Sequence, residues 1–172
     1  YINVEWNLIY VKLKFLQSNT SPNLMNIQTG KSNFIILYHR TPFDEEINEN
    51  GERKWVDQKS PNGIIPTLRN LFKQRKNGTW IAWREVSNLE DEINENIDIS
   101  DPYSFTLKRI PLKKEEISSF YHVTSKESFW PILHTFPTYF DVNNADWSIF
   151  EEVNKRFSTA ACEEASLNAT VW

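Results

Sequence analysis

The stretch Phe34-Ile35-Ile36-Leu37-Tyr38-His39-Arg40 decides the fold class of this chain. Its first five residues form the longest uninterrupted apolar run, and a short run of this kind is typical of a strand that is buried on both faces. Further strands are expected at residues 79–83 and 105–110, with helical patterns between them. Strands that alternate with helices predict an α/β domain with a mainly parallel sheet.

Helical spacing of apolar residues marks the segments between and after these strands. Residues 64–72 place their apolar side chains on one face, and Asn77-Gly78 is expected to end that helix. Residues 111–121 and 126–134 are also expected to be helical. Asp146 is a plausible N-cap for a longer helix, whose apolar residues continue to Ala161.

The remaining segments have turn and loop compositions. Residues 18–33 are expected to form a linker, and residues 1–17 strands or a hairpin. Asn50-Gly51 is a strong turn signal within a polar stretch, and the acidic residues 87–102 are expected to be irregular.

Composition limits the classes of function. The chain has 172 residues, which allows one domain, and a formal net charge of −4, which argues against a dedicated nucleic-acid binder. Five apolar residues in a row are too few to span a membrane. The single cysteine, Cys162, excludes an internal disulfide and makes a cytoplasmic location the default expectation. Seven Trp and an aromatic content of 14% would suit a sugar or base platform, although most such rings lie in protein cores.

The ends of two predicted strands and one loop before a helix could bind a ligand. Ligands of open α/β sheets bind beyond the carboxyl ends of the strands, where Arg40 follows the first strand and Trp83 ends the next. The planar guanidinium of Arg40 could hold a phosphate or carboxylate, or could be an ordinary surface arginine. Asn62-Gly63 precedes a helix N-terminus and could approach an anion, or could be a plain turn.

Other common chemistries have no motif here. The histidines His39, His122 and His134 have no zinc-site spacing, and there is no G-x-S-x-G nucleophile motif. No metal site is therefore expected.

Three stretches together resemble a known enzyme family. They are LYHRTPFDE (37–45), KSPNGIIPTL (59–68) and YHVTSKESFWPILHTFP (121–137). In this order they are similar to the amino-terminal half of the glucosylglycerol-phosphate and trehalose-6-phosphate synthases, which are retaining glycosyltransferases with two Rossmann-like domains, the GT-B fold. The resemblance covers about residues 34–172 and implies the Rossmann-like amino-terminal domain, incomplete at its carboxyl end.

Departures from the trehalose branch favour a glycerol-phosphate acceptor. That branch tends to read Ser-Asn-Arg at the first strand, Gly-Gly-Leu at the loop, and Phe-Ser-Asn before Leu-Trp-Pro. Here His39 precedes Arg40, Asn62 replaces the first glycine, and Thr124-Ser125-Lys126 precedes Phe129-Trp130-Pro131.

The resemblance also implies a reaction and its site residues. Glucose would pass from ADP-glucose to glycerol 3-phosphate with retention, or from UDP-glucose to glucose 6-phosphate in the trehalose reading, without a metal or a cofactor. The acceptor would be a small phosphorylated molecule, and no residue of this chain is expected to be catalytic. The implied acceptor-binding residues are Arg40, Trp83 (with Trp80 as a nearby alternative), Tyr121 and Trp130, and the implied donor-phosphate loop is Asn62 with Gly63.

The resemblance also implies a domain organisation. Residues 1–33 are expected to be an extension or linker, and residues 34–172 an acceptor-binding domain. The closing residues Ala169-Thr170-Val171-Trp172 predict the start of a strand, directly before the position where the family places a His-Asp-Tyr motif. We therefore expect a fragment that lacks its donor-binding domain and is inactive alone. Two alternatives remain open: that the chain is a non-catalytic module that binds phosphate esters, and that it forms an oligomer.

Overall fold

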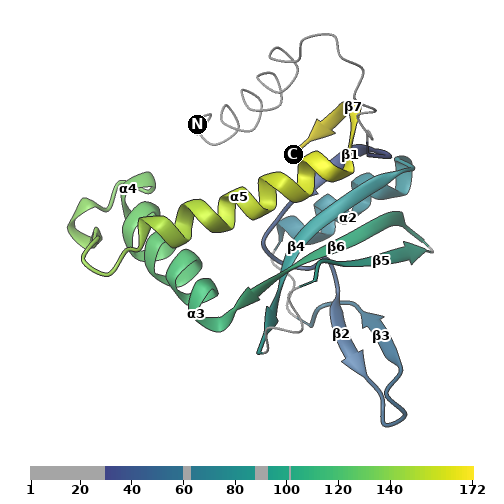
Figure 1. Cartoon of the computed structure of the whole chain (residues 1–172), viewed down its shortest axis with the longest axis horizontal. Helices are drawn as coiled ribbons and strands as arrows, with labels where there is room; N and C mark the ends of the chain where they lie inside the picture. Colours follow the sequence, from purple (N-terminus) through teal and green to yellow (C-terminus); the bar gives the residue numbers. More distant parts are fainter. Residues whose placement is uncertain (1–29, 60–62, 88–92, 101) are drawn as a thin grey trace.

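The computed structural model describes residues 30–59, 63–87, 93–100 and 102–172. These residues form a five-stranded sheet with the order β5-β6-β4-β1-β7, and a separate β2–β3 hairpin (Figure 1). The strands are β1 Ser32–Leu37, β2 Asp44–Ile47, β3 Arg53–Val56, β4 Gly78–Val86, β5 Glu95–Ser100, β6 Ser104–Lys113 and β7 Ala165–Val171.

The sheet is mainly parallel, as the sequence predicts. Strand β1 pairs in parallel with β4 and β7, and β4 pairs in parallel with β6. Only the edge strand β5 is antiparallel among the described strands of this sheet. The fold is therefore the expected α/β class.

Helices cover both faces of the sheet. Their bounds are α2 Ile64–Gln74, α3 Lys114–Ile117, η2 Ser118–Phe129, α4 Trp130–Leu133, η3 Pro137–Tyr139 and α5 Trp147–Glu164. On one face, Phe72 of α2 packs against Phe105 with 4.4 Å between ring centroids, beside Trp80. On the other face, Ile35 and Ile81 pack against Ala160 of α5. Alternate residues of β1 and β4 thus enter two separate cores, as a strand buried on both faces requires.

Several local expectations are confirmed. A strand covers residues 34–37 of the expected 34–38, and the helix from Ile64 is present, although it ends at Gln74 and Gly78 already begins β4. Asn50-Gly51 lies in the β2–β3 hairpin, where Gly51 has a φ of 79°. Asp146 caps α5, because its carboxylate accepts hydrogen bonds from the backbone N–H of Ser148 at 3.0 Å and of Ile149 at 3.1 Å.

Other expectations were wrong at segment boundaries. The helix expected from residue 111 begins at Lys114, because β6 continues through Pro111 to Lys113. Strand β1 begins at Ser32, inside the predicted linker, and β7 begins at Ala165, four residues before the expected start at Ala169. The predicted structure of residues 1–17 lies outside the described residues.

The position of Pro111 has a physical reason. Strand β5 pairs with β6 only up to the Glu95–Arg109 pair, so Pro111 lies where one side of β6 has no strand partner among the described residues. A proline there costs no ladder hydrogen bond on that side. Its carbonyl accepts a hydrogen bond from Arg156 of α5.

Strand β5 was not predicted from the sequence. Residues 95–100 are part of the stretch expected to be irregular, yet all six of them pair with residues of β6, from Ser104 to Arg109. Their alternation is visible in the burial of Ile97 and Ile99 against the first core. The acidic and polar residues between them face outward, as in an edge strand with one solvated face.

Candidate functional site

The carboxyl ends of β1 and β4 lie side by side and present aromatic and cationic residues. Tyr38, His39 and Arg40 follow β1 directly, and Trp83 lies near the end of β4. The backbone N–H of Trp83 donates to the carbonyl of His39 at 3.4 Å, and the two rings are 5.2 Å apart. The parallel pairing of the two strands therefore brings residues 39 and 83 together.

The helix η2 adds Tyr121 to this group. The ring of Tyr121 lies 4.7 Å from that of His39 and 5.6 Å from that of Trp83, measured between centroids. Two of the acceptor-site residues implied by the resemblance, Trp83 and Tyr121, thus contact one histidine, and a third, the exposed Arg40, follows that histidine in the chain.

Lys126 completes the group. Its ammonium lies 4.6 Å from the ring centroid of Tyr121, in cation–π geometry. We call Arg40, His39, Trp83, Tyr121 and Lys126 the His39 cluster.

The π-helical form of η2 explains how Lys126 reaches Tyr121. In a π-helix, residues five apart are joined by hydrogen bonds, and the N–H of Trp130 donates to the carbonyl of Ser125 in this way. In an α-helix, residues five apart would point about 140° away from each other around the axis. The sequence pattern of an ordinary helix therefore gives no sign that Lys126 and Tyr121 share a face.

The electrostatics of the cluster keep His39 neutral. Burial, together with the nearby cations Arg40 and Lys126, lowers the pKa of His39 from 6.5 to about 4. Its Nε2 is buried and has no hydrogen-bond partner among the described residues. At neutral pH the imidazole is therefore an uncharged ring between aromatic neighbours, and the positive charge of the cluster comes from Arg40 and Lys126.

The other implied site residues lie elsewhere. Trp130 is half exposed on α4 and stacks on His134 at 4.2 Å. Trp80, the alternative to Trp83, is fully buried at 0% exposure and donates to the carbonyl of Arg40 at 2.9 Å, so it belongs to the core and cannot line a binding surface. Gly63 is exposed and directly precedes α2, whereas Asn62 lies outside the described residues.

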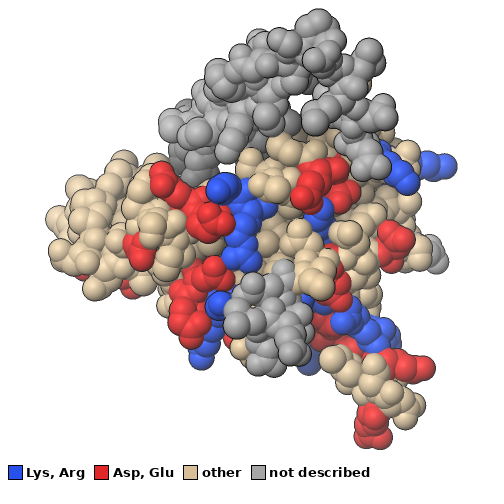
Figure 2. All heavy atoms as spheres, viewed as in Figure 1, with Lys and Arg blue, Asp and Glu red and all other residues tan. Residues whose placement is uncertain are grey.

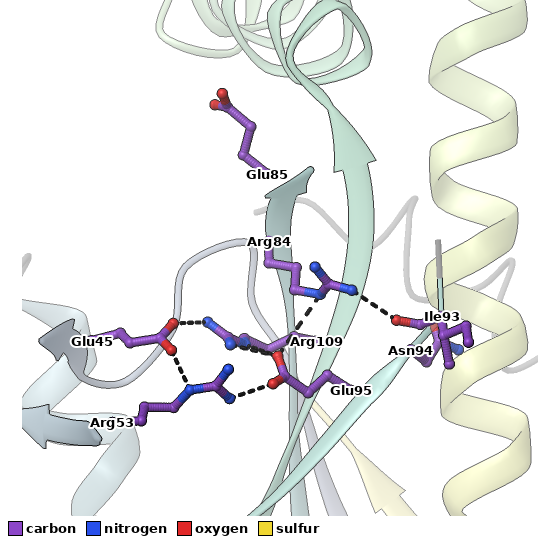
Figure 3. Close-up of a pocket in the computed structure, with 8 residues that line it drawn as sticks. All are labelled: Glu45, Arg53, Arg84, Glu85, Ile93, Asn94, Glu95 and Arg109. Atoms are coloured by element: carbon purple, nitrogen blue, oxygen red, sulfur yellow. Dashed lines mark hydrogen bonds and ion pairs between the residues drawn. The ribbon is translucent and has the colours of Figure 1, made fainter. Parts of the chain in front are cut away.

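A large hollow lies at a different place. It has a volume of about 520 Å³ and opens between the β2–β3 hairpin and the strands β4, β5 and β6 (Figure 3). Its walls carry Glu45, Arg53, Arg84, Glu85, Ile93, Asn94, Glu95 and Arg109. No residue of the His39 cluster lines this hollow, or a second one of about 170 Å³ beside α5.

The charges in this hollow already neutralise one another. Glu95 accepts hydrogen bonds from Arg53 and from Arg109, and Glu45 pairs with the same two arginines (Figure 3). Burial alone would raise the pKa of Glu95, but the two guanidinium groups outweigh it and lower the pKa. These ion pairs attach the hairpin to the sheet, and we assign no ligand to the hollow.

Sequence reasoning missed two members of the His39 cluster as site residues. His39 stood next to Arg40 in the decisive stretch, and Lys126 was visible only as a departure from the trehalose branch. Within the described ranges, no group of three or more His, Cys, Asp or Glu is arranged to hold a metal ion. No helix in that part of the chain is long and apolar enough to cross a membrane.

Comparison with known proteins gives a family match over most of the chain. Residues 32–172 match glycosyltransferase family 20. The glucosylglycerol-phosphate synthase of Synechocystis sp. is 44% identical over 143 residues, which cover 82% of this chain and 28% of that enzyme. The enzyme of the same name from Pseudomonas anguilliseptica is 37% identical over 148 residues, covering 84% of this chain and 20% of its own length. A trehalose-6-phosphate synthase of Mycolicibacterium gilvum is 29% identical over 147 residues, with 84% and 28% covered.

Solved structures share the fold. A trehalose-phosphate synthase from Burkholderia xenovorans in complex with glucose 6-phosphate aligns with a TM-score of 0.62 at 15% identity, over 82% of this chain and 27% of that one. The Escherichia coli enzyme bound with UDP-2-fluoro glucose aligns with a TM-score of 0.60 at 14% identity, over the same shares. The sheet and helices described above thus match the amino-terminal Rossmann-like domain of these enzymes, and the chain spans about 28% of the length of the Synechocystis relative.

Proposed function

This chain belongs to glycosyltransferase family 20, and from that premise we propose that it is the acceptor-binding domain of a glucosylglycerol-phosphate synthase. In this proposal residues 34–172 form the domain and residues 1–33 an extension. The enzyme transfers glucose from ADP-glucose to glycerol 3-phosphate with retention. Relatives named for this product are 37–44% identical to the chain, whereas the trehalose-6-phosphate synthase of Mycolicibacterium gilvum is 29% identical.

The observation that carries the proposal is the contact of Trp83 and Tyr121 with His39, near the charge of Arg40, at the carboxyl end of β1. Ligand sites in open α/β sheets lie at this edge. A guanidinium and a phenol beside two further rings suit a small molecule that carries a phosphate.

Each residue has a distinct proposed role. Arg40 binds the acceptor phosphate through charge-assisted hydrogen bonds, which are stronger than neutral ones. Tyr121 donates its hydroxyl to the same phosphate. Trp83, together with Trp130 from α4 outside the cluster, walls the acceptor and keeps water from the reactive glycosyl centre.

The donor is bound mainly by groups beyond this chain. Asn62 and Gly63 form the proposed loop near the donor phosphates, where the N-terminus of α2 favours an anion. The leaving diphosphate needs charge stabilisation, which the proposal assigns to a second Rossmann-like domain. We place the reaction in the cytoplasm, in keeping with a chain whose single cysteine forms no disulfide within it.

The test is an activity assay of the full-length gene product with ADP-glucose and glycerol 3-phosphate, and in parallel with UDP-glucose and glucose 6-phosphate. We expect transfer to glycerol 3-phosphate. The variant Arg40→Met should lower kcat/KM for this acceptor about 10- to 100-fold, the range expected for a lost hydrogen bond to a charged group.

The matched control is Arg75→Met. Arg75 is an exposed arginine whose guanidinium lies 4.5 Å from the ring of Phe34, outside the His39 cluster. It should keep the wild-type acceptor kinetics. If glucose is transferred only to glucose 6-phosphate, the proposal is wrong and the enzyme is a trehalose-6-phosphate synthase. Binding of phosphate esters without any transfer would leave a non-catalytic binding module.

A further inference from the structure

We propose that Lys126 is a second phosphate-binding residue of the acceptor site and acts with Arg40 on the same phosphate group. This inference rests on the proposed function, and it concerns a residue to which neither the family match nor the resemblance assigns a role.

The position of Lys126 is the first argument. Its ammonium lies over the ring of Tyr121 at 4.6 Å, and that ring lies 4.7 Å from His39. Arg40 follows His39 directly in the chain and lies close enough to act on the charge of its imidazole, as Lys126 also does. Both cations therefore lie near the His39–Tyr121 ring pair, although they come from segments 86 residues apart in the numbering of the chain.

The second argument is that both cations are available. Within the described ranges, neither Arg40 nor Lys126 forms an ion pair with a carboxylate. The buried arginine of the hollow, Arg109, is in contrast paired with two carboxylates. Two cations that pair with no carboxylate among the described residues, beside a neutral imidazole, are suited to an anion from outside.

The third argument is the charge of the ligand. A phosphate monoester carries between about −1.5 and −2 at pH 7, because its second pKa lies near 6. Arg40 alone would balance roughly half of that charge. The ammonium of Lys126 supplies the rest and can rotate three donors toward the phosphate oxygens.

The test compares acceptors with and without the phosphate, using the full-length gene product and the variant Lys126→Gln. We expect KM for glycerol 3-phosphate to rise about 10- to 100-fold while kcat stays within about twofold, because the lost contact serves binding more than chemistry. Binding of inorganic phosphate, measured by calorimetry, should weaken in parallel. Weak use of free glycerol should not change.

Two further variants separate a phosphate contact from a structural role. Lys126→Arg keeps a cation at this place and should retain KM within a few-fold. The matched control is Lys73→Gln, because Lys73 holds its ammonium 5.4 Å over the ring of Tyr103, in the same geometry but outside the cluster. It should behave as the wild type.

Each adverse outcome has its own meaning. If Lys126→Gln leaves the kinetics of glycerol 3-phosphate unchanged while Arg40→Met impairs them, the inference about Lys126 is wrong and the proposed function stands. If Lys126→Gln weakens glycerol and glycerol 3-phosphate equally, Lys126 only supports Tyr121 and the inference is again wrong. If the wild-type enzyme neither binds nor uses glycerol 3-phosphate, the proposed function fails and the inference fails with it.

Discussion

The pKa of His39 depends on both the burial and the charges of the candidate site. The imidazole packs against Tyr38, Trp83 and Tyr121, and its pKa is lowered from 6.5 to about 4 by burial and by two neighbouring cations. A neutral histidine leaves the positive field of Arg40 and Lys126 without a third charge that repels them. Its contribution is to hold the aromatic walls in place rather than to bind an anion itself.

This shift predicts a pH dependence of stability. The unfolded chain binds a proton at His39 near pH 6.5 and the folded chain only near pH 4, so acidification between these values favours unfolding, by up to about 3 kcal/mol. Above pH 6.5 the effect is absent. We expect His39→Asn to lose this part of the acid sensitivity, measured by urea unfolding at pH 7 and pH 4.5.

The control for this prediction is His134→Asn, which removes an exposed imidazole stacked on Trp130. That variant still contains His39 and should keep the wild-type loss of stability on acidification. Equal acid sensitivity in His39→Asn and the wild type would contradict the assignment.

Among the elements, the β2–β3 hairpin shows how a small unit is held against a large sheet. The hairpin projects from the body of the molecule (Figure 1), and it joins β5 and β6 through the ion pairs of the hollow (Figure 3). Arg109 is the buried member: it pairs with Glu45 of β2 and Glu95 of β5, and its guanidinium lies 5.1 Å from the ring of Trp55. Arg53 contacts the same two carboxylates from the exposed side.

We predict that Arg109→Met destabilises the fold by about 3 kcal/mol, because it leaves two partly buried carboxylates without their buried cation. The matched variant Arg53→Met should cost under about 1 kcal/mol, since exposed ion pairs contribute little. Urea unfolding of both variants at pH 7 measures the difference. Equal effects of the two substitutions would show that burial of Arg109 does not matter.

On the scale of the whole molecule, apolar surface is concentrated in one lobe. Charged residues of both signs are interspersed over the sheet and α5, whereas the lobe that carries α4 is mostly uncharged in this view (Figure 2). Its exposed residues extend from Trp130 to Trp147 and include Tyr139 at 75% exposure. Exposed apolar surface of this kind marks an interaction site or an association hazard.

We therefore predict that the isolated 172-residue chain self-associates at micromolar concentration. The double variant Leu133→Lys with Phe136→Lys should reduce association, because it places charge in the apolar lobe. A control double variant, Ile47→Lys with Ile93→Lys, changes exposed residues outside that lobe and should not. Light scattering measures all three, and a monodisperse wild-type chain would contradict the prediction.

The sequence by itself determined the features that depend on near neighbours. The run 34–38 had to be a buried strand, residues 64–72 had the period of a helix, and Asp146 could cap α5, because each pattern is complete within a few residues. The position of Trp83 beside the carboxyl end of β1 also followed from the expected parallel pairing, although β4 continues past Trp83 to Val86.

Only the tertiary structure decided the rest. Strand β5 has little strand character without β6 beside it, and Pro111 remains in a strand because β5 no longer pairs at that point. Lys126 reaches Tyr121 only on a π-helical turn, and His39 becomes neutral only when packing buries it between segments far apart in the chain. Pairing, burial and helix form depend on contacts between distant residues, and a local sequence pattern does not contain those contacts.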